Sequence, residues 1–182
     1  MTAADKIYDL KAATAFLQNV ADLLKKRSWF KTDGWLCSVH TFPPSPAAPE
    51  SVTMHVYKKN WFNDDRRGVH FETNLSKKEW REQSVPVVMH ILHGELVPGS
   101  NLKRIKLAAP FIDRMGAQIS GWAGYKFRAG KYGTQPFNHD IAIDLSERDK
   151  SAALVADEFE HLCLHLGVAM DEVIATVCKT SI

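Results

Sequence analysis

The sequence predicts a single α+β domain over residues 1–182, in which an antiparallel or mixed sheet of about five to six strands packs with N-terminal, central and C-terminal helices. Helical periods of apolar residues occur at both ends and in the middle of the chain. The stretches between them alternate apolar and polar residues, as strands do. Short links join consecutive strands, which favours antiparallel pairing.

The first element is an amphipathic helix over residues 5–27. Its apolar residues recur at steps of three and four, and Lys25, Lys26 and Arg27 lie in its last turn. Cations in that turn interact favourably with the helix dipole. Asp33 and Gly34 then close this unit.

Strands are expected next, because bulky residues alternate with polar ones. An exposed loop over residues 43–50 should follow the first strand, since four of these eight residues are prolines without a backbone donor. The first three strands are predicted over residues 35–42, 52–57 and 69–74, and a short helical turn or loop over 76–83. The β-branched run Val85–His93 is predicted as a fourth strand, whose start Pro86 confines to an edge or an unpaired position.

The C-terminal half is predicted to contain a helix, a β-hairpin and two more helices. Apolar positions from Leu102 to Ile119 form the first helix, in which Pro110 predicts either a kink or two short helices. Gly167 is expected to end the next helix. The hairpin is expected over residues 125–129 and 137–145 around a 130–135 turn, a capping box at Ser146 and Asp149 begins the following helix, and a shorter helix covers 168–178.

Composition excludes several classes of protein. With 45% hydrophobic and 24% charged residues, the chain is typical of a soluble globular domain and is neither disordered nor fibrous. No apolar run approaches a membrane span, and Asp5 and Asp9 stand where a secretory signal carries positive charge. Cys37, Cys163 and Cys178 match no zinc module or redox pair. A cytoplasmic protein without membrane contact or cofactor is expected.

Charge is distributed unevenly along the chain. Residues 25–139 carry 18 basic and 9 acidic side chains, whereas residues 140–182 carry 3 and 9. Two interpretations are open: the basic segment binds an anionic partner, or it is neutralised by the acidic C-terminal helix.

A histidine-rich sheet face is the first candidate site. His40, His55 and His70 lie near the middle of three predicted strands, and Tyr57 and Glu72 share their phase. If the registers match, one face carries three imidazoles, a phenol and a carboxylate, a set that could bind a ligand or a metal ion. The favoured interpretation is a solvated or hydrogen-bonded structural face, in which the histidines bind no ion and are separately hydrogen-bonded or exposed to water. His90 is left out of this set, because Val88 and Leu92 share its phase.

A second metal candidate lies in the C-terminal helix. His161 and His165 are four residues apart, with Asp157 one turn earlier, so all three share one helix face. Leu162 stands where a zinc protease would carry its catalytic glutamate. A solvated polar face is the simpler interpretation.

The third candidate is an aromatic and basic sheet edge. The run from Lys58 to Arg67 places two aromatic residues between basic pairs at a predicted hairpin tip. Exposed aromatic residues with a charged rim can anchor a protein partner, and the same combination can stack on single-stranded nucleic acid. The residues proposed to bind the partner are Lys58, Lys59, Trp61, Phe62, Arg66 and Arg67.

These patterns favour a small binding protein that engages a macromolecule, a protein more than a nucleic acid, through that edge. An enzymatic role is not favoured, and the oligomeric state stays open. The alternatives are a nucleic-acid-binding accessory protein and a metal-assisted hydrolase or nuclease on the histidine face. The element order also fits a PD-(D/E)xK nuclease core, but Asn74 stands where that motif requires lysine.

Overall fold

The elements follow the predicted order, except for an additional short helix at residues 28–32 and for the end of the chain. The structure is a computed structural model that describes residues 7–46, 48–92, 94–128 and 135–179. The strands are β1 (Trp35–Phe42), β2 (Ser51–Lys58), β3 (Val69–Ser76), β4 (Ser84–Ile91), β5 (Tyr125–Phe127) and β6 (Phe137–Ala142). The α-helices are α1 (Leu10–Lys25), α2 (Ser28–Thr32), α3 (Lys77–Glu82), α4 (Ala108–Ser120) and α5 (Arg148–Lys179), and the 3₁₀ helices are η2 (Lys59–Trp61) and η3 (Arg104–Leu107).

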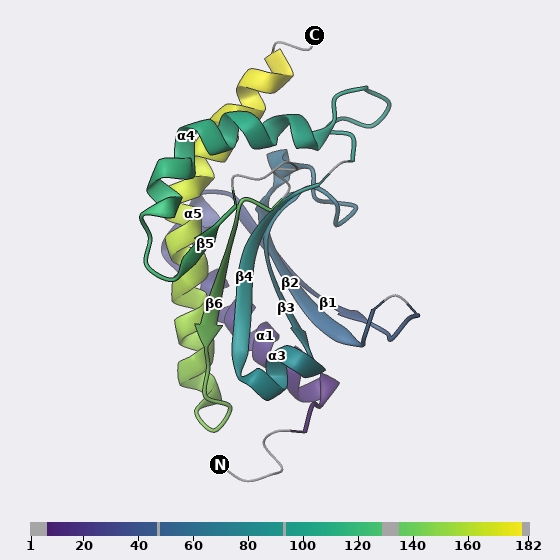
Figure 1. The fold of residues 1–182 in the computed structure, drawn as a ribbon, viewed down its shortest axis with the longest axis vertical. Coiled ribbons are helices and arrows are strands. Elements are labelled where there is room, and N and C mark those ends of the chain that lie inside the picture. The colour runs from purple at the N-terminus through teal and green to yellow at the C-terminus, as the bar shows by residue number, and fades with distance from the viewer. Residues whose placement is uncertain (1–6, 47, 93, 129–134, 180–182) are drawn as a thin grey trace.

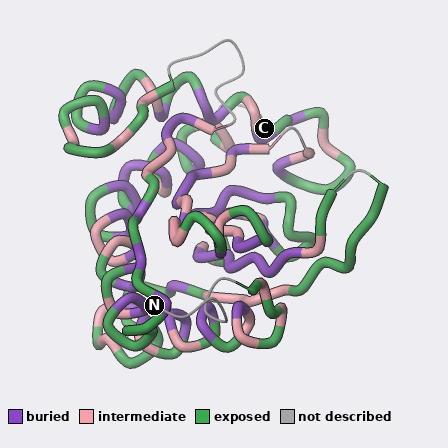
Figure 2. The backbone as a smooth tube through the Cα atoms, turned by 60° about the horizontal axis from the view of Figure 1, so that its bottom comes forward, coloured by how far each residue is buried: buried purple, intermediate pink, exposed green. Residues whose placement is uncertain are grey.

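One antiparallel six-stranded sheet, in the order β1-β2-β3-β4-β6-β5, organises the molecule. In Figure 1, α1 and α5 lie side by side behind the sheet, and α4 crosses near its upper end. Figure 2 shows the buried segments gathered in the interior of the molecule and exposed segments along much of its outside. The α+β class with an antiparallel sheet is therefore confirmed.

Local signals in the sequence account for several helix ends. The Asp9 side chain accepts a hydrogen bond from the backbone N–H of Lys11 at the start of α1. Ser76 and Glu79 form a capping box at α3. Pro110 lies in the first turn of α4, directly after η3, so the prediction of two short helices is confirmed.

The prediction that Gly167 ends a helix is wrong, because α5 continues through it to Lys179. A Cβ atom at Gly167 would lie 2.6 Å from Cζ2 of Trp35, so the glycine gives the indole ring room to pack across the helix. The predicted capping box at Ser146 and Asp149 is not formed either. The Ser146 hydroxyl donates to Asp144, and Asp149 accepts from Asn19.

By length and composition alone, α5 is long and apolar enough to cross a membrane. An 18-residue window within it has a mean hydropathy of 1.4, and 44% of that window is buried in the protein. Core helices of soluble proteins pass the same test, so this helix is weak evidence for a membrane role.

The acidic helix α5 pairs with basic residues from the middle of the chain. Asp171 binds Lys58 with an oxygen-to-nitrogen distance of 2.7 Å, and Glu172 binds Arg114. Arg27 pairs with both Asp157 and Glu160. These contacts favour internal charge complementarity as the explanation of the uneven charge.

Candidate metal centre

Strand register brings the histidine-rich positions onto one sheet face. Ser38 lies opposite His55, His55 opposite Glu72, and His70 opposite His90. Residues opposite each other in an antiparallel pair point to the same side. The intervening Phe71 points the other way and stacks on Trp35, which contacts α5. The cluster therefore lies on the face opposite α1 and α5.

Three imidazole nitrogens surround one carboxylate oxygen, Oε2 of Glu72. The distances to it are 3.0 Å from Nε2 of His55, 3.2 Å from Nε2 of His70 and 3.3 Å from Nδ1 of His90. His55 and His70 stack with ring centroids 3.9 Å apart. Both histidines are buried, so little water reaches these contacts. We call Glu72, His55, His70 and His90 the histidine cluster.

Side-chain amides determine which nitrogen of His55 and of His90 carries the proton. Asn63 accepts from the backbone N–H of Gly68 through Oδ1, at 3.0 Å, so its amide nitrogen faces Nδ1 of His55. Gln135 likewise accepts from Arg128, and its amide nitrogen faces Nε2 of His90 at 3.1 Å. Both contacted nitrogens are therefore acceptors. His55 donates to Glu72 through Nε2–H, and His90 donates through Nδ1–H.

In His70, the proton lies on the ring nitrogen that faces away from Glu72. Its Nδ1 lies 3.0 Å from the carbonyl oxygen of Gly68, which can only accept, so the proton is on Nδ1. A neutral His70 then directs the lone pair of Nε2 at Oε2 of Glu72, 3.2 Å away. Two electron-rich atoms at this distance need a cation between them, either a proton or a metal ion.

Burial and hydrogen bonding set the charges of His70 and Glu72. Burial lowers the pKa of His70 to about 4, against the opposing influence of Glu72. Burial alone would raise the pKa of Glu72, but hydrogen bonds from His55 and His90 outweigh it and hold that pKa well below its usual range. At neutral pH the pair thus combines a neutral imidazole with an ionised carboxylate, the forms that bind metals.

The spacing of the cluster suits one ion. Among the described residues, His55, His70 and Glu72 form the group of potential ligands whose atoms all lie within 4.8 Å of one another. Two ligand atoms about 2.1 Å from a common ion, at about 90 to 110° to each other, lie about 3.0 to 3.4 Å apart. The nitrogen-to-oxygen distances of the cluster, 3.0 to 3.3 Å, fall in this range.

Two predicted members of the face lie outside the cluster. Nε2 of His40 contacts the Ser38 hydroxyl at 3.0 Å, and its ring centroid is 5.8 Å from that of His55. Burial, Arg66 and His55 lower the pKa of His40. Tyr57 lies near the end of β2, opposite Leu36 of β1, and lines a surface hollow with Leu36 and Cys37.

Sequence reasoning missed His90 and Asn63. The exclusion of His90 was wrong, because its apolar neighbours in phase do not prevent it from facing Glu72 across the β3–β4 register. The short link between the third and fourth predicted strands was the signal that could have identified His90, because it indicates that these two strands pair and that His90 can lie beside the histidine face. Asn63 lies in the β2–β3 loop, where no periodicity could reveal its contact with His55.

The second metal candidate does not form a three-ligand group among the described residues. Asp157 is ion-paired with Arg27. His161 and His165 do pack together with ring centroids 4.3 Å apart, against Trp122. They form a histidine pair on the surface of α5.

The prediction that Trp61 and Phe62 are both exposed is wrong. Trp61 is fully buried, packs against Trp35 and Phe71, and donates its indole N–H to Asp171 at 2.8 Å. Phe62 is half-buried, and Lys58 pairs with Asp171. Lys59, Arg66 and Arg67 are exposed, so partner binding at this edge stays a prediction without its main aromatic anchor.

Comparisons of the chain with protein-family models, with curated proteins and with solved structures found no match. The case for function therefore depends on the geometry of the site.

Proposed function

We propose that this protein binds one divalent transition-metal ion at the histidine cluster and uses it for metal-assisted hydrolysis. The observation that carries the proposal is the contact between Nε2 of His70 and Oε2 of Glu72, 3.2 Å apart, with the His70 proton held on Nδ1 by the Gly68 carbonyl. Metal-binding histidines commonly donate their second ring N–H to a backbone carbonyl in this way.

The ligand types favour zinc and a catalytic role. Two histidines and one glutamate, as His55, His70 and Glu72 would supply, form a set that catalytic zinc sites use, with a further position left for water. Structural zinc sites are usually closed by cysteines. Neither Cys37 nor Cys163 belongs to the group of potential ligands.

The residues of the cluster would have different roles. His70 and Glu72 form the prepared pair of ligands. His55 joins them as its other neutral tautomer, in which Nδ1 carries the proton and Nε2 is free to bind the ion. His90 is a positioning residue, since its Nδ1–H orients the carboxylate.

The ion would lower the pKa of its bound water, whose proton passes to solvent. The resulting hydroxide oxygen forms a bond to the electrophilic atom of the substrate. The leaving group departs with the electrons of the broken bond and takes a proton from solvent.

The test is a zinc titration of untagged, chelator-treated protein against a chromophoric competitor, together with elemental analysis. We expect one tight zinc per chain, lost in His70→Ala and in Glu72→Gln. The matched control is the double variant His161→Ala with His165→Ala, which removes the surface pair and should keep the tight site.

A proton in place of the metal would contradict the proposal. His70 would then be an imidazolium paired with Glu72 in a buried ion pair. Its ring signals in an NMR titration would show a pKa above 7, and zinc would bind no more tightly to the wild-type protein than to His70→Ala.

A further inference from the structure

One edge of the sheet, the outer side of β1, is open along its whole length. Within the described part of the chain, β2 is the one strand that pairs with β1, and no further backbone hydrogen bond to β1 occurs there. Figure 1 shows β1 at the outer side of the sheet. Every second residue of β1 directs its N–H and C=O groups to this side. These groups can pair with a further strand.

Strand β1 lacks the features by which proteins usually prevent edge-to-edge pairing. Such features are charged residues, prolines, bulges or a very short strand. None of its eight residues is Asp, Glu, Lys, Arg or Pro, and its register with β2 runs through all eight without a bulge. The opposite edge, β5, has three residues with the exposed Lys126 in the middle. The β1 edge is therefore the one suited to pairing.

Two exposed apolar side chains lie near the ends of β1. Leu36 is 41% exposed and Phe42 is 39% exposed, and both share the phase of Ser38, which faces the histidine side of the sheet. Each lies three residues from Val39. If a second copy of β1 pairs antiparallel about a two-fold axis at Val39, Leu36 of each copy lies opposite Phe42 of the other. One contact then covers the exposed apolar residues of both strands.

A hollow at the Leu36 end of β1 can receive the Phe42 ring of the second copy. Its volume is about 490 Å³. Its wall combines three aromatic rings and a leucine with two lysines, and an ammonium group over the face of an aromatic ring is favourable. The lining residues that matter here are Lys25, Phe30, Lys31, Trp35, Leu36 and Tyr57.

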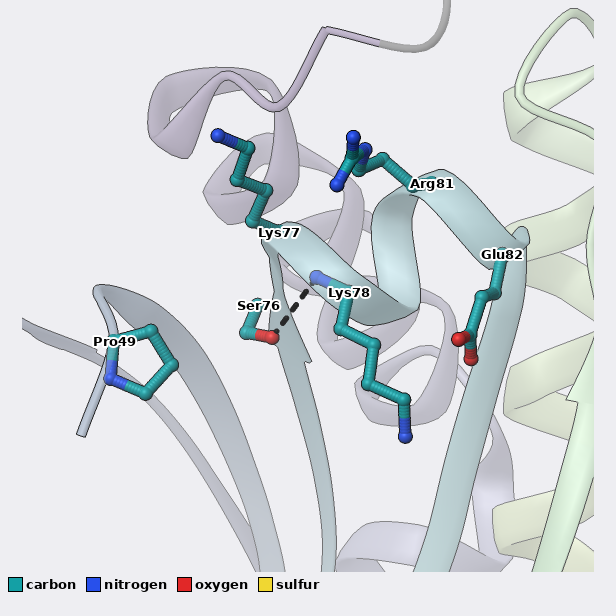
Figure 3. Close-up of a pocket in the computed structure, with 6 residues that line it drawn as sticks. All are labelled: Pro49, Ser76, Lys77, Lys78, Arg81 and Glu82. Carbon is teal, nitrogen blue, oxygen red and sulfur yellow. Dashed lines mark hydrogen bonds between the residues drawn. The ribbon is translucent and has the colours of Figure 1, made fainter.

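The two ends of β1 differ, which favours antiparallel over parallel pairing. Phe42 lies opposite Ser51, and Ser51 opposite Ser76, at the end of the sheet where Pro49 and α3 border a depression. Figure 3 shows four charged side chains of α3 at this depression. In a parallel pair, Phe42 of both copies would meet at this charged end. In an antiparallel pair, each Phe42 meets the aromatic hollow. The charged residues are Lys77, Lys78, Arg81 and Glu82.

The surface along this edge is large enough for a stable dimer. A standard interface uses about 20 to 30 residues and about 800 Å² on each side, roughly 8% of the 9587 Å² surface of this protein. Strand β1, the described residues of the following loop and the lining of the hollow form one strip of about 20 residues. Prolines make that loop stiff, so little conformational entropy is lost when it becomes part of an interface.

We infer that the β1 edge binds a second copy of this chain, so that two six-stranded sheets join into one continuous antiparallel sheet. The inference is independent of the metal site. Residues opposite each other point to the same side, so the histidine faces of both copies lie on one side of the joined sheet. His40 of each copy lies opposite Ser38 of the other.

Sedimentation velocity of the full, untagged chain in the presence of a chelator tests the inference over a wide range of concentrations. The 20.5 kDa chain should form a reversible dimer of twice that mass. Leu36→Glu and Phe42→Lys should each weaken dimerisation at least tenfold, because each places a charge opposite an apolar side chain. The matched control is Leu154→Glu, which changes a leucine of α5 that is 49% exposed and should dimerise like the wild type.

A double variant tests the register. Leu36→Glu combined with Phe42→Lys should dimerise at least tenfold more tightly than either single variant, because opposite charges then face each other between the two copies. The two positions lie about 20 Å apart along one strand, so these charges cannot pair within one chain. Circular dichroism shows whether each variant is folded. Where a charged variant does not fold, Leu36→Thr and Phe42→Thr replace it, and each should weaken dimerisation at least threefold.

Three outcomes would overturn the inference. The first is a wild-type protein that stays monomeric at every concentration. The second is a dimer that the variants of Leu36 and Phe42 leave unchanged, because the contact then lies elsewhere. The third is a double variant that dimerises no better than the single variants, because Leu36 and Phe42 then do not face each other.

Discussion

Asn63→Asp should tighten zinc binding by about 10- to 100-fold, the range in which residues behind a metal ligand act. Asn63 donates to Nδ1 of His55 at 3.3 Å and so keeps the proton of that histidine on Nε2, the nitrogen that would bind the ion. Aspartate could still accept from Gly68, and it would also accept a proton on Nδ1 of His55. The Nε2 lone pair would then be free for the metal.

The same substitution should destabilise the metal-free protein. Asn63 is 3% exposed, so an aspartate there is a buried charge close to Glu72. The cost should be about 1 to 3 kcal/mol, since one buried polar contact becomes unfavourable. Zinc should therefore raise the melting temperature of Asn63→Asp more than that of the wild type.

Competition with a chromophoric chelator measures the affinity, and Asn74→Asp is the charge control. Asn74 lies on the same face and contacts Thr53 instead of a histidine. If Asn74→Asp tightens zinc binding as much as Asn63→Asp does, the gain comes from charge alone. The reasoning about the His55 proton would then be refuted, as it would be by weaker binding in Asn63→Asp.

Three further predictions concern stability. Gly167→Ala should lower the free energy of unfolding by about 1 to 3 kcal/mol in urea, because its Cβ would lie 2.6 Å from Trp35; an unchanged midpoint would contradict this packing. Asp171→Ala should cost about 1 to 3 kcal/mol in the same assay, since Lys58, Asn60 and Trp61 all lose their acceptor, and a loss no larger than for Glu147→Ala would be evidence against it. The metal-free protein should lose stability as the pH falls from 6.5 towards 4. In this window His70 takes up a proton in the unfolded chain but not in the folded protein, where its pKa is about 4. His70→Gln should make the free energy of unfolding depend less on pH over the same range.

The sequence by itself determined the elements and the two sides of each strand. Periodicity is a property of neighbouring residues, so α1, the first four strands and the break before α4 could all be predicted locally. The shared phase of His55, His70 and Glu72 was visible for the same reason. The hairpin turn expected at 130–135 lies largely outside the described residues.

Tertiary structure decided which of these side chains meet. The β3–β4 register placed His90 beside Glu72, and the β2–β3 loop brought Asn63 to His55. Packing buried Trp61 under α5, although its charged neighbours in the sequence suggested exposure. Gly167, a residue that ends many helices, instead made room for Trp35. Contacts between distant segments depend on strand register and packing, and the pattern of residues within one segment contains no information about either.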